Sequence, residues 1–205
     1  MSLSVEDKIY ASIRRKGVGC VITNSDFYRI ANRGTVGRCL NSLKNKKIIR
    51  SLTVGIYDYP QYDTFLREYL APDMDKVAQA IARKNQWHIQ ITGATALNYL
   101  GLSTQVPGRY TYLSDAKGTV YNILNRTLEF RQASLKMSKF TSRRTEVVVQ
   151  ALLSLGQENL TLDSYAGIAA YVGEKETKKI LNDSRYAPAW IGELLRQIIT
   201  AISHS

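Results

Sequence analysis

The chain has 205 residues, of which 44% are hydrophobic, so it can bury one core or two small ones, and this argues against wholesale disorder. Its net charge of +11 is clustered: residues 1–60 carry eleven Lys/Arg against four Asp/Glu, and residues 126–144 carry six against one. Such clusters favour nucleic acid, because binding releases counterions from its phosphates. No apolar run approaches the roughly 18 residues of a membrane span, and the acidic start MSLSVEDK is not a secretory signal, so we expect a cytoplasmic protein that binds no membrane.

Metal-binding residue types are scarce. Cys20 and Cys39 lie nineteen positions apart, and histidine occurs only as His88 and His204. These are too few ligands, at the wrong spacing, for a structural zinc site. We therefore expect neither a metal nor a cofactor.

The first elements are two predicted helices. Val5, Ile9 and Ile13 recur at helical spacing, which predicts an amphipathic helix over residues 4–15. The sequence TNSD at residues 23–26 matches a capping box, in which the first and last side chains satisfy free backbone N–H groups. A second helix is therefore expected to run to about residue 31.

A third helix is predicted over residues 35–46, after a turn at residues 32–34 in which Gly34 is available for a positive φ. Its apolar stripe consists of Val36, Leu40 and Leu43, so at about 100° per residue the opposite face carries polar residues. No acidic residue occurs between residues 29 and 50. The third helix is thus suited to approach DNA.

The polar face holds side chains that can read bases. Arg38 can bind guanine bidentately and Asn41 can bind adenine, while lysines at the end of the helix suit phosphates. A β-prone pair, IIRSL and IYDYP, follows around Gly55 and predicts a hairpin. The residues predicted to contact DNA are Arg33, Thr35, Arg38, Asn41, Lys44, Asn45, Lys46, Lys47, Arg50 and Thr53.

Helix, turn, basic helix and hairpin together predict a winged helix-turn-helix in residues 1–60, which presents one helix to the major groove. The alternative is a fold of this kind that serves only as a protein-interaction platform. Residues 61–72 are expected to be a linker. The predicted fold class is α+β: the winged helix is followed by a small mixed α/β domain, residues 73–205, that ends in a helical segment.

The later region predicts a helix from Asp73, a strand at WHIQIT, a helix at GATALNYLG, and three β-prone runs, RYTYLS, TVYNIL and TLEFRQA. Helical patterns fill the chain after residue 143. A second basic surface could add DNA contacts or meet an acidic partner, and composition does not choose between them. Its residues are Arg126, Arg131, Lys136, Lys139, Arg143 and Arg144.

Catalytic motifs are not apparent in the sequence. There is no Gly-rich phosphate loop followed by Lys. The Asp73–Asp75 pair resembles the paired aspartates of nucleotidyltransferases, but that signature needs a Gly-Ser dipeptide, which this chain lacks. Helix capping explains the aspartates better, and we expect that the protein is not an enzyme.

Several segments together resemble one family. The stretches RRKGVGCVITNSDF, GIYDYP, VAQAIARKNQ, ITGATALNYLGLSTQVPGRYTYLSD and DSRYAPAWIGELLRQI are similar to AbiEi-type antitoxins of type IV toxin–antitoxin systems. The resemblance implies that an N-terminal winged helix binds double-stranded operator DNA of its own operon and represses it. It also implies that the C-terminal domain counteracts a nucleotidyltransferase-like toxin encoded nearby.

Two alternative functions and the oligomeric state stay open at the level of sequence. The protein could neutralise a toxin without specific DNA binding, or be an orphan regulator that has no toxin. A homodimer and a monomer that binds paired sites are equally compatible with the pattern.

Overall fold

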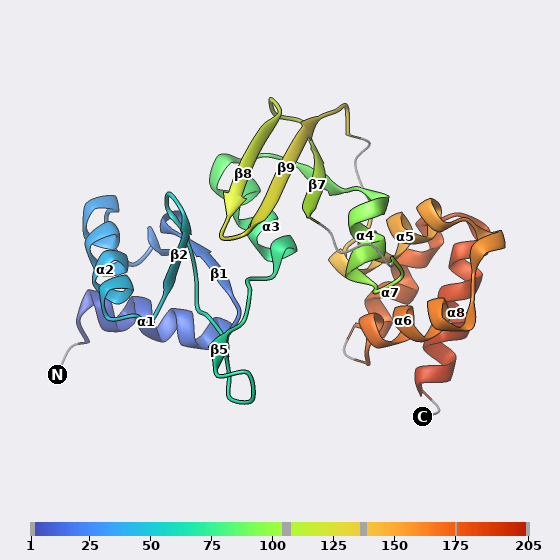
Figure 1. Ribbon diagram of the computed structural model, residues 1–205, viewed down its shortest axis with the longest axis horizontal. Coiled ribbons are helices and arrows are strands. Elements are labelled where there is room, and N and C mark those ends of the chain that lie inside the picture. The colour runs from blue at the N-terminus through green and yellow to red at the C-terminus, as the bar shows by residue number, and fades with distance from the viewer. Residues whose placement is uncertain (1–2, 104–107, 136–138, 175, 204–205) are drawn as a thin grey trace. The chain divides into compact units, whose positions relative to one another are not determined.

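The computed structural model describes residues 3–103, 108–135, 139–174 and 176–203, and these form two compact units. The first unit contains Met1–His88 and Val120–Leu128, and the second contains Ile89–Thr119 and Glu129–Ser205. Helices and several small sheets occur together, so the predicted α+β class is confirmed at this level (Figure 1).

The first unit begins with two helices against a small sheet. The helices are α1 (Val5–Lys16) and α2 (Arg33–Asn45), and the strands are β1 (Val21–Thr23), β2 (Arg50–Thr53) and β3 (Ile56–Asp58). The strand order is β1-β3-β2, with both pairings antiparallel. The alternating apolar residues of these elements meet in one core, as expected from amphipathic helices on a sheet. That core consists of Ile9, Ile13, Ile22, Phe27, Val36, Leu40, Leu43 and Ile49.

The expected second helix is shorter and tighter than predicted. The segment is a 3-10 helix, η1 (Asn24–Phe27), followed by turns. The capping box does form, because the N–H of Thr23 donates to Asp26 at 2.8 Å. Short polar side chains such as these compete with helical backbone bonding, which explains why the α-helix does not continue.

The predicted turn at Gly34 is also wrong. Gly34 lies inside α2 without a positive φ, and the helix starts at Arg33, two residues before the predicted start at residue 35. Asn32 is the N-cap, since its side chain accepts the N–H of Thr35 at 3.0 Å. The later turn is confirmed: Gly55, with φ of 71°, joins β2 to β3.

A second hairpin and a helix follow the β2–β3 hairpin in this unit. A short antiparallel hairpin, β4 (Tyr62–Asp63) and β5 (Glu68–Tyr69), lies within the stretch expected to be a linker. Helix α3 (Met74–Asn85) follows, and Asp73 caps it by accepting the N–H groups of the first turn. The buried face of α3 packs against β1 and β3.

Val120–Leu128 belong to the first unit, and the second unit contains the other β-prone residues from Ile89 on and the helical segment. Its helix α4 (Gly93–Tyr99) follows β6 (Ile89–Ile91), and β6 pairs antiparallel with β7 (Arg109–Ser114). Strands β8 (Thr119–Ile123) and β9 (Arg126–Gln132) continue the sheet in the order β6-β7-β9-β8. The expected strand positions are therefore confirmed.

Four further helices follow in the part of the chain where helical patterns were predicted. They are α5 (Arg143–Leu155), α6 (Leu162–Val172), α7 (Thr177–Asp183) and α8 (Ala189–Ser203), with 3-10 turns η2 (Gln157–Asn159) and η3 (Ser184–Tyr186) between them. Helix α4 approaches α5 closely at Gly93, where an added Cβ would lie 2.4 Å from the Cβ of Ser154. Only glycine fits that contact without a shift.

A buried carboxylate joins α7 to the start of α5. Asp183 is fully buried and accepts the N–H groups of Thr141 and Ser142 at 2.9 and 2.8 Å. It also accepts the hydroxyls of Thr141 and Thr145 at 2.9 and 3.1 Å. Burial alone raises the pKa of Asp183, but these hydrogen bonds outweigh it and hold the pKa below its ordinary value.

Candidate nucleic-acid interface

Helix α2 separates an apolar face from a basic and amide face. Val36, Leu40 and Leu43 are buried in the core of the unit. The predicted DNA-contacting residues that are exposed are Arg33, Arg38, Asn41, Lys44, Asn45, Lys46 and Lys47, whereas Thr35, Arg50 and Thr53 are half-buried. The exposed residues form one surface, which we call the α2 surface.

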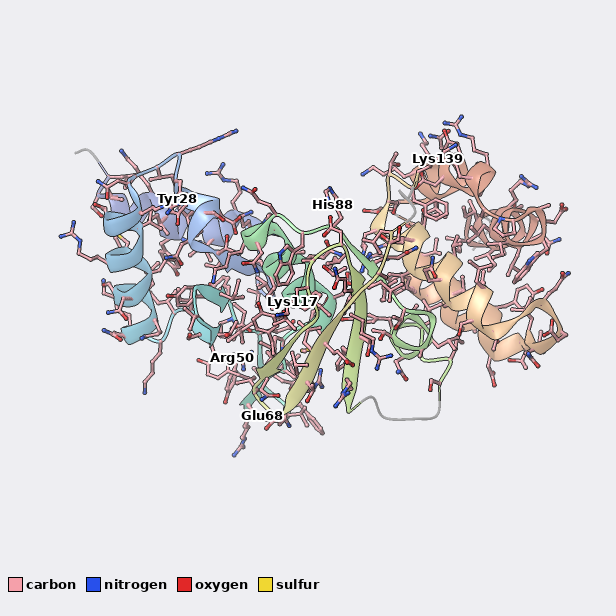
Figure 2. All side chains as sticks on the ribbon, turned by 90° about the horizontal axis from the view of Figure 1, so that it is seen from above. Tyr28, Arg50, Glu68, His88, Lys117 and Lys139 are labelled. Atoms are coloured by element: carbon pink, nitrogen blue, oxygen red, sulfur yellow. The ribbon has the colours of Figure 1, made fainter. Side chains whose placement is uncertain are left out.

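Two arginines of the α2 surface are held by near neighbours. The Arg38 Nη2 donates to the Thr35 Oγ1 at 3.3 Å, one turn earlier in the helix. The Arg33 guanidinium lies 5.3 Å from the centre of the Tyr28 ring, which is partly exposed (Figure 2). Tyr28 was not predicted as part of the site, and a lone tyrosine gives no periodic signal that would find it. Such contacts orient guanidinium groups at little energetic cost.

The lysines at the end of α2 differ in their contacts. Lys44 and Lys47 are exposed and make no ion pair within the described residues. Lys46 forms an ion pair with Glu6 of α1. The hydrogen bond between them raises the pKa of Lys46 and lowers the pKa of Glu6. Lys46 is therefore partly neutralised within the protein.

Arg50 is committed to contacts inside the first unit. Its guanidinium donates to both carboxylate oxygens of Asp58, at 3.1 and 2.6 Å, and to the carbonyl of Leu70 at 3.0 Å. Asp58 is buried and Arg50 is half-buried. This bidentate pair joins β2 to β3 and to the base of the β4–β5 hairpin, so the geometry gives Arg50 a structural role. Its predicted contact with DNA stays untested.

Helix α3 contributes cations that the sequence did not place at the site. The Lys84 Nζ donates to the carbonyl of Val54 at 2.6 Å, at the tip of the β2–β3 hairpin. The Arg83 Nε lies 3.1 Å from Asp26, and the Lys76 Nζ donates to the carbonyl of Gly19 at 3.3 Å. These pairs lie 30 to 57 positions apart in sequence, so no local pattern could predict them. Helix α3 thus holds the tip of the β2–β3 hairpin.

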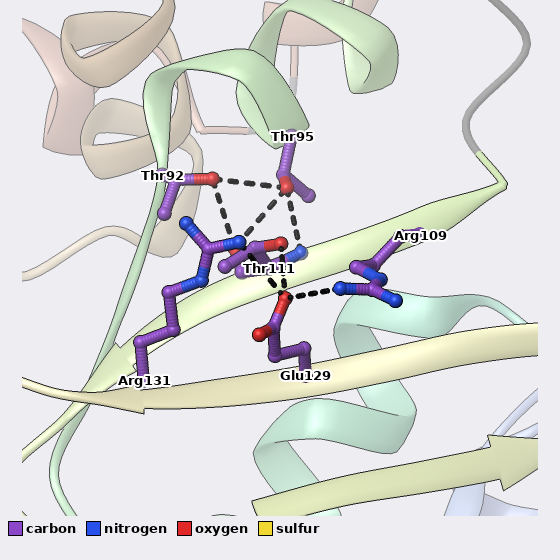
Figure 3. Close-up of polar contacts among 6 residues, drawn as sticks. All are labelled: Thr92, Thr95, Arg109, Thr111, Glu129 and Arg131. Atoms are coloured by element: carbon purple, nitrogen blue, oxygen red, sulfur yellow. Dashed lines mark hydrogen bonds and ion pairs between the residues drawn. The ribbon is translucent and has the colours of Figure 1, made fainter. Parts of the chain in front are cut away.

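In the second unit, Arg109 of β7 and Arg131 of β9 share one carboxylate. Glu129 lies between them, at 3.4 Å from Arg109 and 3.1 Å from Arg131 (Figure 3). The hydrogen bond from Arg131 lowers the pKa of Glu129. Beside them, Thr95 Oγ1 accepts the N–H of Thr111 at 2.9 Å, so the GATAL stretch holds α4 against β7.

The remaining residues of the predicted second basic surface have other contacts. Arg143 pairs with Glu146, and Arg144 donates to the carbonyl of Val172 at 3.0 Å, at the end of α6. Lys139 lies over the ring of Tyr186 at 5.7 Å (Figure 2). Arg126 is half-buried on β9, and Lys136 lies outside the described residues. Each described member of this set has a local contact of its own within the protein, and its predicted contact with DNA or an acidic partner stays a prediction.

The described residues contain no group of three or more His, Cys, Asp or Glu side chains arranged to hold a metal ion. Among the helices of this described part, none is long and apolar enough to cross a membrane.

Comparison with known proteins identifies the family. Residues 8–180 match the model of a family of unknown function, DUF6088, and the chain belongs to this family. No curated protein matches the chain. Among solved structures, the chain is similar to the crystal structure of the RV2827C protein from Mycobacterium tuberculosis, at 12% identity and a TM-score of 0.39. That match covers 94% of this chain and 76% of the other.

Proposed function

We propose that the protein is a DNA-binding transcriptional repressor, with a winged helix-turn-helix in residues 1–60. The order α1, β1, η1, α2, β2, β3 supports this reading. In it, η1 takes the place of the first helix of the helix-turn-helix, α2 is the recognition helix, and the β2–β3 hairpin is the wing.

The observation that carries the proposal is the charge of the α2 surface. Five cations lie on α2 and the two residues after it, and no carboxylate occurs between residues 29 and 50. These side chains are exposed while the opposite side of the helix is buried. An α-helix fits the DNA major groove, and cations along it would replace counterions of the phosphates.

The residues of this surface have separate proposed roles. Arg38, already oriented by Thr35, and Asn41 would read base edges, because Arg suits guanine and Asn suits adenine. Lys44 and Lys47 would contact phosphates, which gives affinity without sequence choice. Arg33 and Asn45 would lie at the two ends of the contacted segment. Lys46 would contribute less than its neighbours, since Glu6 competes for it.

Resemblance to AbiEi-type proteins supports the biological part of the proposal. On that basis the chain would repress its own operon and act as the antitoxin of a type IV toxin–antitoxin system. The toxin would be a nucleotidyltransferase-like protein with a Gly-Ser and paired-aspartate signature, encoded beside it. Rescue of growth when both genes are expressed together would support the antitoxin role, and continued toxicity would leave a plain regulator.

Repression can be tested with a reporter gene placed behind the DNA that lies upstream of this gene. We expect the wild-type protein to lower reporter expression, and the Arg38→Ala variant to lower it much less. Equal expression with and without the wild-type protein would contradict the proposed function. The exposed Leu162→Ser variant in the second unit is a suitable control, because it changes no residue of the α2 surface.

A further inference from the structure

Tyr28 is an exposed aromatic residue in the turn that leads into helix α2 (Figure 2). It is 39% exposed, whereas the preceding residue, Phe27, is fully buried in the core of the first unit. The N–H of Ile30 donates to the carbonyl of Phe27 at 2.8 Å, which closes the turn. The buried neighbour and this bond fix the point from which the Tyr28 side chain leaves the protein surface.

The two parts of the Tyr28 side chain differ in what they contact. The ring lies under the guanidinium of Arg33, whose Cζ is 5.3 Å from the ring centroid. The hydroxyl makes no hydrogen bond to another residue in the part of the chain that the structure describes. The ring therefore orients one cation, while the hydroxyl is available to donate a hydrogen bond to a ligand.

The charge around Tyr28 indicates the chemistry of that ligand. Residues 27–35 contain Arg29 and Arg33 and no carboxylate, so this segment has a net charge of +2. The carboxylate that precedes it, Asp26, is already paired with Arg83 at 3.1 Å. A hydroxyl donor beside a guanidinium suits phosphate oxygens, which accept bonds from Tyr and Arg in complexes with DNA.

The length of α2 places this pair where DNA has phosphates. Helix α2 has 13 residues and is about 20 Å long, whereas the major groove is roughly 12 Å wide. A helix that is longer than the groove is wide brings both of its ends close to the phosphate backbone. Lys44 and Lys47 lie at one end of α2, and Tyr28 and Arg33 lie at the other.

We propose that Tyr28 is a further DNA-binding residue, which donates its hydroxyl to a backbone phosphate and holds Arg33 in place for the same backbone. The proposal rests on the proposed binding of DNA by the α2 surface, to which it adds a residue and a role. The hydroxyl is uncharged, so its contact adds affinity but no salt dependence, whereas the contact of Arg33 adds both. Because the ring already orients Arg33, less side-chain freedom is lost on binding.

Two substitutions separate the hydroxyl from the ring. Tyr28→Phe removes the hydroxyl and keeps the ring under Arg33, so affinity for the upstream and scrambled duplexes should fall alike, by about threefold, with an unchanged salt slope. Tyr28→Ala also frees Arg33, so affinity should fall by about threefold more. Fluorescence anisotropy with both duplexes, at three salt concentrations, measures the affinities and the slopes.

The role of the ring predicts that its effect depends on Arg33. Arg33→Ala alone should lower the salt slope by about one unit. In that background, Tyr28→Phe and Tyr28→Ala should weaken binding equally, because there is no guanidinium left to orient. If the difference between the two variants stayed the same without Arg33, the ring would act only on the fold, and the positioning role would be overturned.

A second exposed tyrosine under an arginine provides the matched control. Tyr186 is 43% exposed, and the Cζ of Arg185 lies 4.7 Å from its ring centroid, in the second unit. Tyr186→Phe and Tyr186→Ala should leave DNA affinity unchanged, and circular dichroism checks that every variant is folded.

Two negative results have different meanings. A wild type that binds neither duplex contradicts the proposed function, and this proposal falls with it. If the wild type binds, and Lys44→Ala with Lys47→Ala weakens binding, but both Tyr28 variants bind as tightly as the wild type, this proposal alone is wrong.

Discussion

The cations of the α2 surface and those of the second unit differ in what they contact. Arg109, Arg131 and Arg143 meet carboxylates of their own unit, and Arg144 caps the end of α6. On α2 and the two residues after it, within the described part of the chain, Lys46 alone meets a carboxylate.

Both regions are basic in sequence, so net charge alone does not mark a nucleic-acid surface. What distinguishes them is whether an internal partner already holds each cation. Replacing the paired cations of the second unit should therefore lower the free energy of unfolding. Replacing cations of the α2 surface should lower DNA affinity and leave the free energy of unfolding unchanged.

The largest effect is expected at Asp183. Asp183→Ala removes the acceptor of two buried backbone N–H groups and two hydroxyls, so the second unit should lose about 3 kcal/mol of unfolding free energy. Urea unfolding followed by the fluorescence of Trp190, in a Trp87→Phe background, measures it. DNA affinity should change little, and Asp163→Ala, an exposed residue of α6, is the matched control. A loss below about 0.5 kcal/mol would mean that Asp183 is not the anchor that its hydrogen bonds indicate.

The same carboxylate predicts a dependence on pH. Because its pKa lies lower in the folded protein than its ordinary value of 3.8, its contribution to stability is complete above that pH. The contribution is lost as the pH falls through the folded pKa. Unfolding titrations from pH 6 to strongly acidic solution should show this loss in the wild type and a weaker one in Asp183→Ala. Parallel pH profiles for the two proteins would argue against it.

The next effect is expected at Arg38. Arg38→Ala should relax sequence preference and cost about 1–3 kcal/mol on the cognate base pair, while thermal stability is unchanged. Fluorescence anisotropy with the upstream duplex and with single base-pair variants of it measures both. An unchanged ratio of affinity for upstream and random DNA would remove Arg38 from the reading role.

Replacing Lys44 and Lys47 together by Ala should weaken binding to every DNA sequence. Each phosphate contact adds about one unit to the slope of log affinity against log salt, so the slope should fall by about two. Lys178→Ala with Lys179→Ala, two exposed residues of α7, is the control with equal charge change. An equal fall in the control would mean that total charge matters rather than the α2 surface.

The smallest effect is expected at Lys84. Lys84→Met removes the hydrogen bond to the carbonyl of Val54 and frees the tip of the β2–β3 hairpin, so DNA affinity should fall by about 0.5–1 kcal/mol. Lys76 lies on the same helix as Lys84, and Lys76→Met removes its bond to the carbonyl of Gly19. This variant is the control for a change away from the tip of the β2–β3 hairpin. Equal affinities for the wild type and Lys84→Met would show that the hairpin is not held for binding.

Local signals in the sequence predicted most of the elements. The periodicity of α1, the cap at Asp73 and the turn at Gly55 each depend on a few neighbouring residues, and each is confirmed. The predicted α-helix after Thr23 was wrong, because short polar residues cap a turn as readily as they start an α-helix. The α2 surface was predicted by the same local periodicity, and its residues are exposed as expected.

Contacts between distant residues could not be predicted. Asp183 and Thr141 lie 42 positions apart, and Arg83 and Asp26 lie 57 apart. Composition made Arg50 and Arg143 look equally available to DNA, although each has an internal carboxylate partner. The β4–β5 hairpin could not be predicted for the same reason, because its base is held by a bond from the distant Arg50.

The central claim is that the α2 surface reads DNA sequence. A binding titration of the purified full chain against its own upstream duplex and a scrambled duplex, at two salt concentrations, tests it most directly. Tighter binding to the upstream duplex that survives the higher salt is the predicted result. Equal binding to both duplexes, or no binding, would contradict the claim.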